Sequence, residues 1–134
     1  MPTFKVVVIG ASGVGKTSLR GQYISARFST SYRATIGADF ITKTLPPPPS
    51  SPPNSEPTTL QIWDTAGQER FASLAAAFFR GADAAVLMYD VTRPETLTAL
   101  TTWWAEFCAR APVSEEDVRR GRFCVVVVGN KCDL

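Results

Sequence analysis

One short stretch limits what this chain can fold into. Residues 10–17 read Gly-Ala-Ser-Gly-Val-Gly-Lys-Thr and directly follow the apolar run at residues 4–9. This is the GxxxxGK[ST] spacing of a loop that joins a strand to a helix and binds phosphate. The glycines permit a tight turn whose N–H groups point inward, and the dipole of the following helix adds positive potential. The sequence therefore predicts a phosphate-binding loop; a glycine-rich turn that binds nothing is the alternative.

The side chains of this loop suit the tail of a nucleotide. The Lys16 ammonium can reach the outer phosphates, where it would also support phosphoryl transfer, and the Thr17 hydroxyl can ligate Mg²⁺. The predicted phosphate-binding residues are Ser12, Gly13, Val14, Gly15, Lys16, Thr17 and Ser18.

Composition favours one globular domain. The 134 residues are 45% hydrophobic and 19% charged, and a net charge of +2 gives no indication of nucleic-acid binding. No apolar run is long enough to span a membrane, and we expect no signal peptide at the N-terminus. The cysteines, Cys108, Cys124 and Cys132, are irregularly spaced and suit free thiols in a reducing, cytoplasmic compartment.

Apolar strands alternate with helices along the chain. Strands are predicted at residues 4–9, 36–45, 59–63, 84–91 and 123–128, and helices at 17–25 and 94–110. Near-continuous apolar strands separated by helices predict a mostly parallel sheet with helices on both faces. We expect Trp104 to pack in the core, and the arginines of residues 119–122 to lie in a solvated loop.

Residues 46–57 interrupt this alternation, because seven of the ten prolines lie there. Proline lacks the N–H that a sheet requires, so we expect a solvated loop inserted between two strands, with an edge strand before it. A recognition site for an SH3-type partner is the alternative.

A second motif follows the strand at residues 59–63. Asp64 begins the run Asp-Thr-Ala-Gly-Gln at 64–68. An acidic residue at the end of a strand beside a phosphate-binding loop can hold Mg²⁺. Gly67 allows a backbone N–H to approach the γ-phosphate, and Gln68 can orient an attacking water.

The third motif, Asn-Lys-Cys-Asp at residues 130–133, directly follows the valine run. The Asp133 carboxylate can accept two N–H bonds from guanine, while Asn130 reaches the other edge of the base. Adenine lacks the matching donors and would leave a buried carboxylate unpaired. This motif therefore favours GTP over ATP, although an ATP-using P-loop kinase is a competing interpretation.

Together these motifs resemble the Rab family of small GTPases in the Ras superfamily. The similarity extends to Ile-Gly-Ala-Asp-Phe at 36–40, Arg-Phe-Ala-Ser-Leu at 70–74 and Phe-Phe-Arg-Gly-Ala-Asp at 78–83, and is greatest to the late-endosomal and vacuolar Rab-seven type. It implies an α/β fold, a single P-loop NTPase G domain over residues 1–134, with one antiparallel edge strand in a mostly parallel sheet. It also implies GTP, GDP and Mg²⁺ as ligands.

The resemblance assigns further roles by position. Thr35 would sense the γ-phosphate and Mg²⁺, so that Thr17, Thr35 and Asp64 form the metal site. Phe28 would stack on guanine and Lys131 would lie along the ribose, with Tyr32 also at the nucleotide. Phe40, Trp63 and Phe79 resemble the aromatic triad that contacts effectors, and core packing is the alternative for each. Implied partners are exchange factors, GTPase-activating proteins and effectors.

The chain stops where this family continues with another strand, two helices and a prenylated tail. We expect residues 123–128 to form an exposed apolar edge, and the chain alone to be marginally stable. Membrane association would need a lipid-anchored C-terminus in a longer product. A non-enzymatic remnant that acts only as a protein-interaction module is the alternative function.

Overall fold

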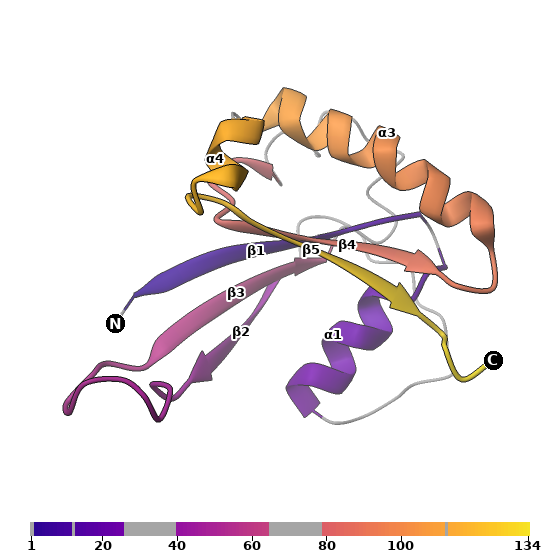
Figure 1. Ribbon diagram of the computed structural model, residues 1–134. Helices are drawn as coiled ribbons and strands as arrows, with labels where there is room; N and C mark the ends of the chain where they lie inside the picture. Colours follow the sequence, from indigo (N-terminus) through magenta and orange to yellow (C-terminus); the bar gives the residue numbers. More distant parts are fainter. Residues whose placement is uncertain (1, 12, 26–39, 65–78, 112) are drawn as a thin grey trace.

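The protein is described by a computed structural model that covers residues 2–11, 13–25, 40–64, 79–111 and 113–134. Its centre is a five-stranded sheet in the order β2-β3-β1-β4-β5 (Figure 1). The elements are β1 (Thr3–Ile9), α1 (Lys16–Ser25), β2 (Phe40–Leu45), β3 (Thr58–Asp64), β4 (Ala84–Asp90), α3 (Pro94–Arg110), α4 (Glu115–Arg119) and β5 (Cys124–Asn130).

Parallel pairing places the carboxyl ends of β1, β3, β4 and β5 side by side, along what is called here the carboxyl edge of the sheet. β1 pairs with β3 and β4, and β4 pairs with β5, all in parallel. In these registers Val8 lies beside Asp64, and Asp90 lies beside Asn130. Open α/β sheets bind ligands outside the carboxyl ends of their strands, so this edge is where a site is expected.

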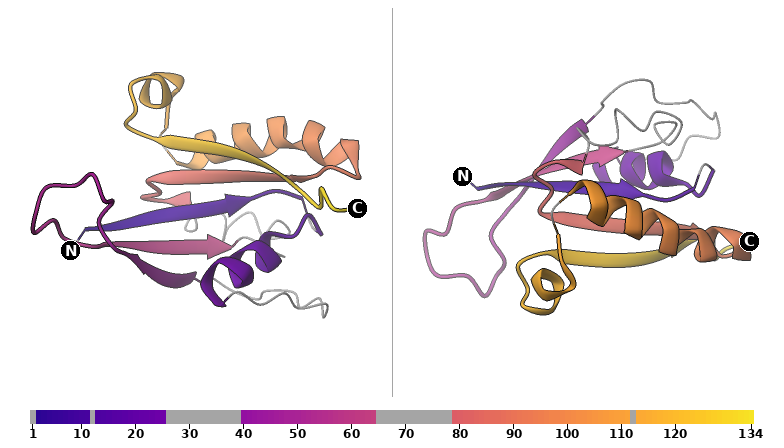
Figure 2. Two further views of the ribbon diagram at one scale, coloured as in Figure 1. Left: turned by 60° about the horizontal axis from the view of Figure 1, so that its bottom comes forward. Right: turned by 90° about the horizontal axis from the view of Figure 1, so that it is seen from above.

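Helices cover both faces of the sheet. α3 and α4 lie on one face and α1 lies on the other (Figures 1 and 2). Alternating side chains of β1 divide between the faces, with Val7 and Ile9 in the core cluster under α3 and Val8 in the opposite cluster. The fully buried Phe107 ring of α3 stacks on Trp104 at 5.6 Å and approaches Phe123 at 5.5 Å between ring centroids. Trp104 therefore packs against the core, as predicted.

The predicted α/β fold is confirmed, including the one antiparallel strand. β2 runs antiparallel to β3 and forms an edge of the sheet. The first described residue of β2 is Phe40, so residues 36–39 of the predicted strand lie outside the described part of the chain.

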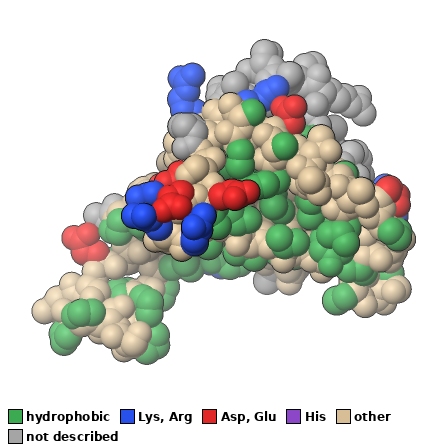
Figure 3. Space-filling view, turned by 45° about the horizontal axis from the view of Figure 1, so that its top comes forward, with side chains coloured by type: hydrophobic (Ala, Val, Ile, Leu, Met, Phe, Trp, Pro, Cys, Tyr) green, Lys and Arg blue, Asp and Glu red, His purple; other side chains and the backbone are tan. Residues whose placement is uncertain are grey.

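The prediction of a loop throughout residues 119–122 was wrong at its start, because Arg119 belongs to the short helix α4. A capping box begins this helix: the Ser114 N–H donates to the Asp117 carboxylate, and the Asp117 N–H donates to the Ser114 hydroxyl. The arginines are exposed as expected, and acidic and basic side chains gather over α4 (Figure 3).

The proline-rich segment forms an irregular loop that projects from the end of the β2–β3 hairpin (Figure 1). It contains two tight turns, in which Ser51 donates to the Pro48 carbonyl and Ser55 donates to the Pro52 carbonyl. These turns interrupt the extended backbone that a proline-binding domain recognises, so the geometry favours the solvated loop.

β5 forms the opposite edge of the described sheet, and Val126 and Val127 are 46% and 57% exposed. The predicted exposure of residues 123–128 therefore holds for these two valines, whereas Phe123 is buried in the core at 5% exposure. Cys108, Cys124 and Cys132 are free thiols. Within the described residues, no helix has the length and apolar character needed to cross a membrane.

Candidate nucleotide-binding site

The phosphate loop, residues 10–17, connects β1 to α1 at the carboxyl edge of the sheet. Gly13 and Gly15 adopt φ values of +80° and +101°, which side chains rarely allow. A Cβ atom at Gly15 would also lie 2.2 Å from the side-chain nitrogen of Asn130. Backbone conformation therefore favours glycine at this position, and a side chain here would also displace the Asn130 amide of β5.

Lys16 is buried at the start of α1, with 3% of its surface exposed. Its ammonium donates to the carbonyl oxygen of Gly10 and lies 3.4 Å from that of Ala11. The Lys16 ammonium thus lies against the backbone of the phosphate loop, beside the N-terminal end of α1. A lysine ammonium and a helix N-terminus both favour the binding of an anion.

The NKxD loop, residues 130–133, is fastened directly to the phosphate loop. The Asn130 amide donates to the Val14 carbonyl oxygen at 2.8 Å, and the Lys131 ammonium donates to the Gly13 carbonyl oxygen at 2.8 Å. These bonds join residues more than a hundred positions apart in the sequence. The predicted convergence of the first and third motifs is therefore present in the structure.

Asp64 ends β3 and is fully buried, at 0% exposure. Its register partner Val8 lies two residues before the phosphate loop begins. A carboxylate in this position is a ligand type that Mg²⁺ prefers. Asp64 thus lies at the end of the strand beside the one that leads into the phosphate loop, and its role as a metal ligand stays a prediction.

Asp90, at the end of β4, is a residue that the sequence motifs did not reveal. Its carboxylate is buried and accepts from the Thr92 N–H at 2.9 Å and the Thr92 hydroxyl at 2.6 Å. It also pairs with Lys131 at 3.0 Å and Arg93 at 3.3 Å. The Thr92 hydroxyl, together with the Thr92 N–H and Lys131, holds the pKa of Asp90 well below its usual value, against the opposing effect of burial. The carboxylate is therefore ionised at neutral pH.

Asp133 is exposed in the terminal turn, which the Leu134 N–H closes by donating to the Lys131 carbonyl oxygen. Several other predicted site residues fall outside the described part of the chain, namely Ser12, Phe28, Tyr32, Thr35, Gly67 and Gln68. The side chains of Thr17 and Phe40 are also outside it. The roles predicted for these residues stay predictions.

Of the predicted effector triad, Phe79 lies in the core with 3% exposure, and its ring is 5.1 Å from that of Phe107. Core packing is thus what the structure shows for Phe79. Trp63 is half-buried against the same core cluster, with the Lys5 ammonium 4.3 Å from its ring centroid.

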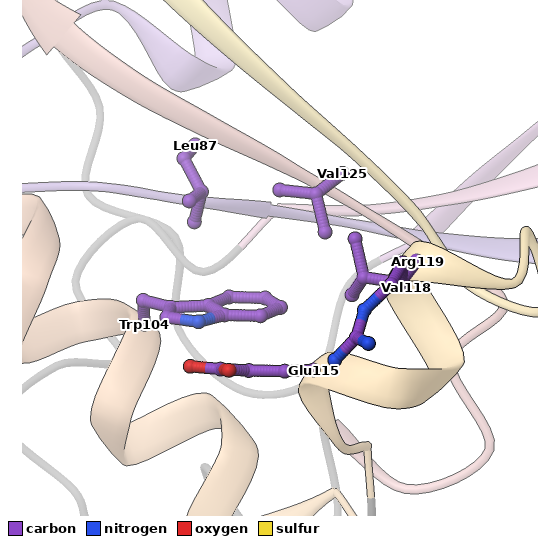
Figure 4. A pocket seen from close by; sticks show the side chains of 6 residues that line it. All are labelled: Leu87, Trp104, Glu115, Val118, Arg119 and Val125. Carbon is purple, nitrogen blue, oxygen red and sulfur yellow. The ribbon is translucent and has the colours of Figure 1, made fainter.

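An apolar pocket of about 360 Å³ lies elsewhere, between α3, α4 and the sheet (Figure 4). Val125, on β5, is one of its lining residues and lies five positions before Asn130. Because a strand rises about 3.3 Å per residue, Val125 and Asn130 are about 16 Å apart along β5. The pocket is therefore distinct from the predicted nucleotide site.

The described residues fit a magnesium-bound nucleotide. Left-handed glycines shape the phosphate loop, a buried ammonium lies within it, and a buried carboxylate ends the neighbouring strand. These are the groups needed for backbone contacts with phosphates, charge neutralisation and metal ligation.

Comparison with known proteins agrees with this geometry. Residues 5–134 match the Ras family. The chain is 52% identical over 130 residues to the "Ras-related protein Rab7" of Drosophila melanogaster, covering 97% of this chain and 58% of that protein. It is 51% identical to "Ras-related protein Rab-7a" of Dictyostelium discoideum and 48% identical to "Ypt/Rab-type GTPase Rab7" of Neurospora crassa, over 130 residues in each case. These matches cover 97% of this chain, 59% of the Dictyostelium protein and 58% of the Neurospora protein.

The chain therefore belongs to the Ras family, and its fold is that of a Ras-family G domain. Within that family its sequence is similar to relatives of the Rab7 type. It spans a little under three-fifths of the length of those relatives.

Proposed function

We propose that this chain is a molecular switch that binds GTP and GDP with Mg²⁺, hydrolyses GTP, and regulates transport between late endosomes and the vacuole or lysosome. The observation that best supports this proposal is the pair of hydrogen bonds from Asn130 and Lys131 to the phosphate loop. They join the two segments whose sequence motifs predict recognition of the base and of the phosphates.

Binding would be shared between these two loops. The backbone N–H groups of residues 13–17 and the Lys16 ammonium would hold the phosphates. Asn130 and Asp133 would read the guanine edge, Phe28 would stack on the base, and Tyr32 would complete the pocket. Adenine would leave Asp133 without donors, which explains a preference for guanine.

Hydrolysis would depend on positioning and charge. Gln68 would orient the attacking water in line with the γ-phosphate, and Lys16 would stabilise charge on the phosphate oxygens in the transition state. Mg²⁺, held through Thr17, Thr35 and Asp64, supplies charge neutralisation when bound. Intrinsic turnover in this class is slow, on the order of 10⁻⁴ s⁻¹.

Regulation would act through the segments that carry Thr35 and Gln68. GTP would order them and hydrolysis would release them, which gives exchange factors, GTPase-activating proteins and effectors two surfaces to distinguish. The partner proteins themselves follow only from the family.

Single-turnover release of phosphate from GTP by the purified chain tests the proposed activity. We expect slow release that requires Mg²⁺ and is blocked by excess GDP but not by excess ADP. Equal release from ATP and GTP would contradict the assignment of Asp133 to guanine.

A further inference from the structure

The two carboxylate oxygens of Asp90 have different partners. One carboxylate oxygen, Oδ1, accepts both the N–H and the hydroxyl of Thr92, two residues further along the chain. The other oxygen, Oδ2, faces cations, with Lys131 at 3.0 Å and Arg93 at 3.3 Å. The side chain is only 2% exposed. The turn after β4 therefore occupies Oδ1, and Oδ2 is left to the two cations.

The Lys131 ammonium is the group that this carboxylate holds. It lies between Asp90 Oδ2 at 3.0 Å and the Gly13 carbonyl oxygen at 2.8 Å. A lysine side chain loses considerable rotational freedom when its ammonium is localised, and a pre-positioned carboxylate lowers that cost at the moment of binding. Asp90 thus connects the end of β4 to the phosphate loop through Lys131.

Backbone hydrogen bonds hold the end of β4, which carries Asp90, in place. The Asp90 N–H donates to the Thr96 hydroxyl at 2.9 Å, and the Val91 N–H donates to the Asn130 carbonyl oxygen at 3.0 Å. The first bond ties Asp90 to the start of α3, and the second continues the pairing of β4 with β5. The end of β4 that carries this carboxylate is therefore held to both α3 and β5, where the nucleotide is proposed to bind.

We propose that Asp90 is a positioning residue, which holds Lys131 against the Gly13 carbonyl so that the NKxD loop and the phosphate loop move as one unit. A purely structural role, in which Asp90 only fixes the turn into α3 through Thr92 and Arg93, is the competing explanation. The two explanations differ in whether the effect of Asp90 passes through Lys131.

Three variants separate them. Asp90→Asn keeps the shape and an acceptor for Thr92 but removes the charge that faces Lys131. Lys131→Met keeps a long, unbranched side chain and removes the ammonium. Thr92→Val is the matched control, because it removes one bond to Asp90 from the turn and leaves the Asp90–Lys131 pair in place.

Amide hydrogen exchange on the full chain, without nucleotide, is the first measurement. Asp90→Asn and Lys131→Met should each raise exchange in peptides that contain residues 10–16 and 130–133, at matched global stability in urea. The Asp90→Asn, Lys131→Met double variant should show no further increase, because both changes break one coupled unit. Thr92→Val should leave exchange in residues 10–16 near the wild-type rate.

Dissociation of a fluorescent GDP analogue is the second measurement, and only this arm rests on the proposed function. Asp90→Asn should speed dissociation on the order of tenfold, as expected when the buried partner of a charge pair beside the ligand is altered. Additive effects in the double variant, or exchange in residues 10–16 that Asp90→Asn leaves unchanged, would overturn the inference. Wild-type chain that binds no GDP would count against the proposed function alone, since the exchange measurement still decides the role of Asp90.

Discussion

The side-chain amide of Asn130 donates to the Val14 carbonyl oxygen at 2.8 Å and so fastens the end of β5 to the phosphate loop. A β-carbon at Gly15 would lie 2.2 Å from the nitrogen of that amide. The two loops of the proposed nucleotide site therefore meet at a contact where an added methyl group would displace the Asn130 side chain.

Gly15→Ala should weaken GDP binding by about ten- to a hundredfold. The φ of +101° costs about 1–3 kcal/mol for a residue with a side chain, and the added methyl group displaces Asn130 from Val14. Titration with a fluorescent GDP analogue measures this effect.

Gly81→Ala is the matched control for that experiment. Gly81 has a φ of +72°, but nothing lies within 4 Å of the position its β-carbon would take. It should lose stability without a comparable loss of GDP affinity. Similar losses of affinity in the two variants would show that backbone strain alone, and not contact with Asn130, explains the result.

Gln68→Leu should slow GTP hydrolysis by at least about tenfold while GTP binding is retained. Leucine has nearly the same size but cannot orient a water by hydrogen bonds. Phosphate release and nucleotide affinity are measured on the same preparation. Unchanged turnover in this variant would remove Gln68 from the mechanism.

Thr17→Asn should lower the affinity for GTP more than that for GDP. The substitution alters the hydroxyl that is predicted to ligate Mg²⁺, and the metal contributes most where the γ-phosphate is present. The ratio of the two dissociation constants, with and without Mg²⁺, is the readout. A ratio equal to that of the wild type would contradict the assignment of Thr17 to the metal.

Acid should reduce the stabilisation that Asp90 provides. Because the pKa of Asp90 is lower in the folded protein than its usual 3.8, the contribution is complete above that value and is lost as the pH falls through the folded pKa. The difference in unfolding free energy between wild type and Asp90→Asn should be constant from about pH 5 to pH 8 and shrink below about pH 4. Urea denaturation across this range measures it, and a difference that grows in acid would have the wrong sign.

The sequence predicts most of the fold because its elements are defined by local signals. The glycine spacing at residues 10–17 and the valine run before Asn130 each determine an element and the end at which its functional residues lie. Parallel pairing then brings those ends together. The right-handed crossovers of parallel strands restrict the possible topologies, whereas the strand order and the register come from the structure.

The other residues of the site belong to no motif with a characteristic spacing, so the sequence alone does not point to them. Asp90 and Thr92 become informative only when β4 lies beside β5 and Lys131 reaches back to Gly13. The helix α4 did carry a local signal, the Ser114-x-x-Asp117 capping box, which the cluster of arginines after it obscured. Phe79 could equally have faced a partner, because an aromatic side chain suits a core and an interface alike.

The central claim is that the phosphate loop and the NKxD loop together bind a guanine nucleotide with Mg²⁺. Isothermal titration calorimetry of the folded chain with GDP, and separately with ADP, in the presence of Mg²⁺ tests it most directly. We expect one GDP per chain and an affinity for ADP at least about a hundredfold lower, because Asp133 would lack its donors. Equal affinity for the two nucleotides, or no heat of binding with either, would contradict the claim.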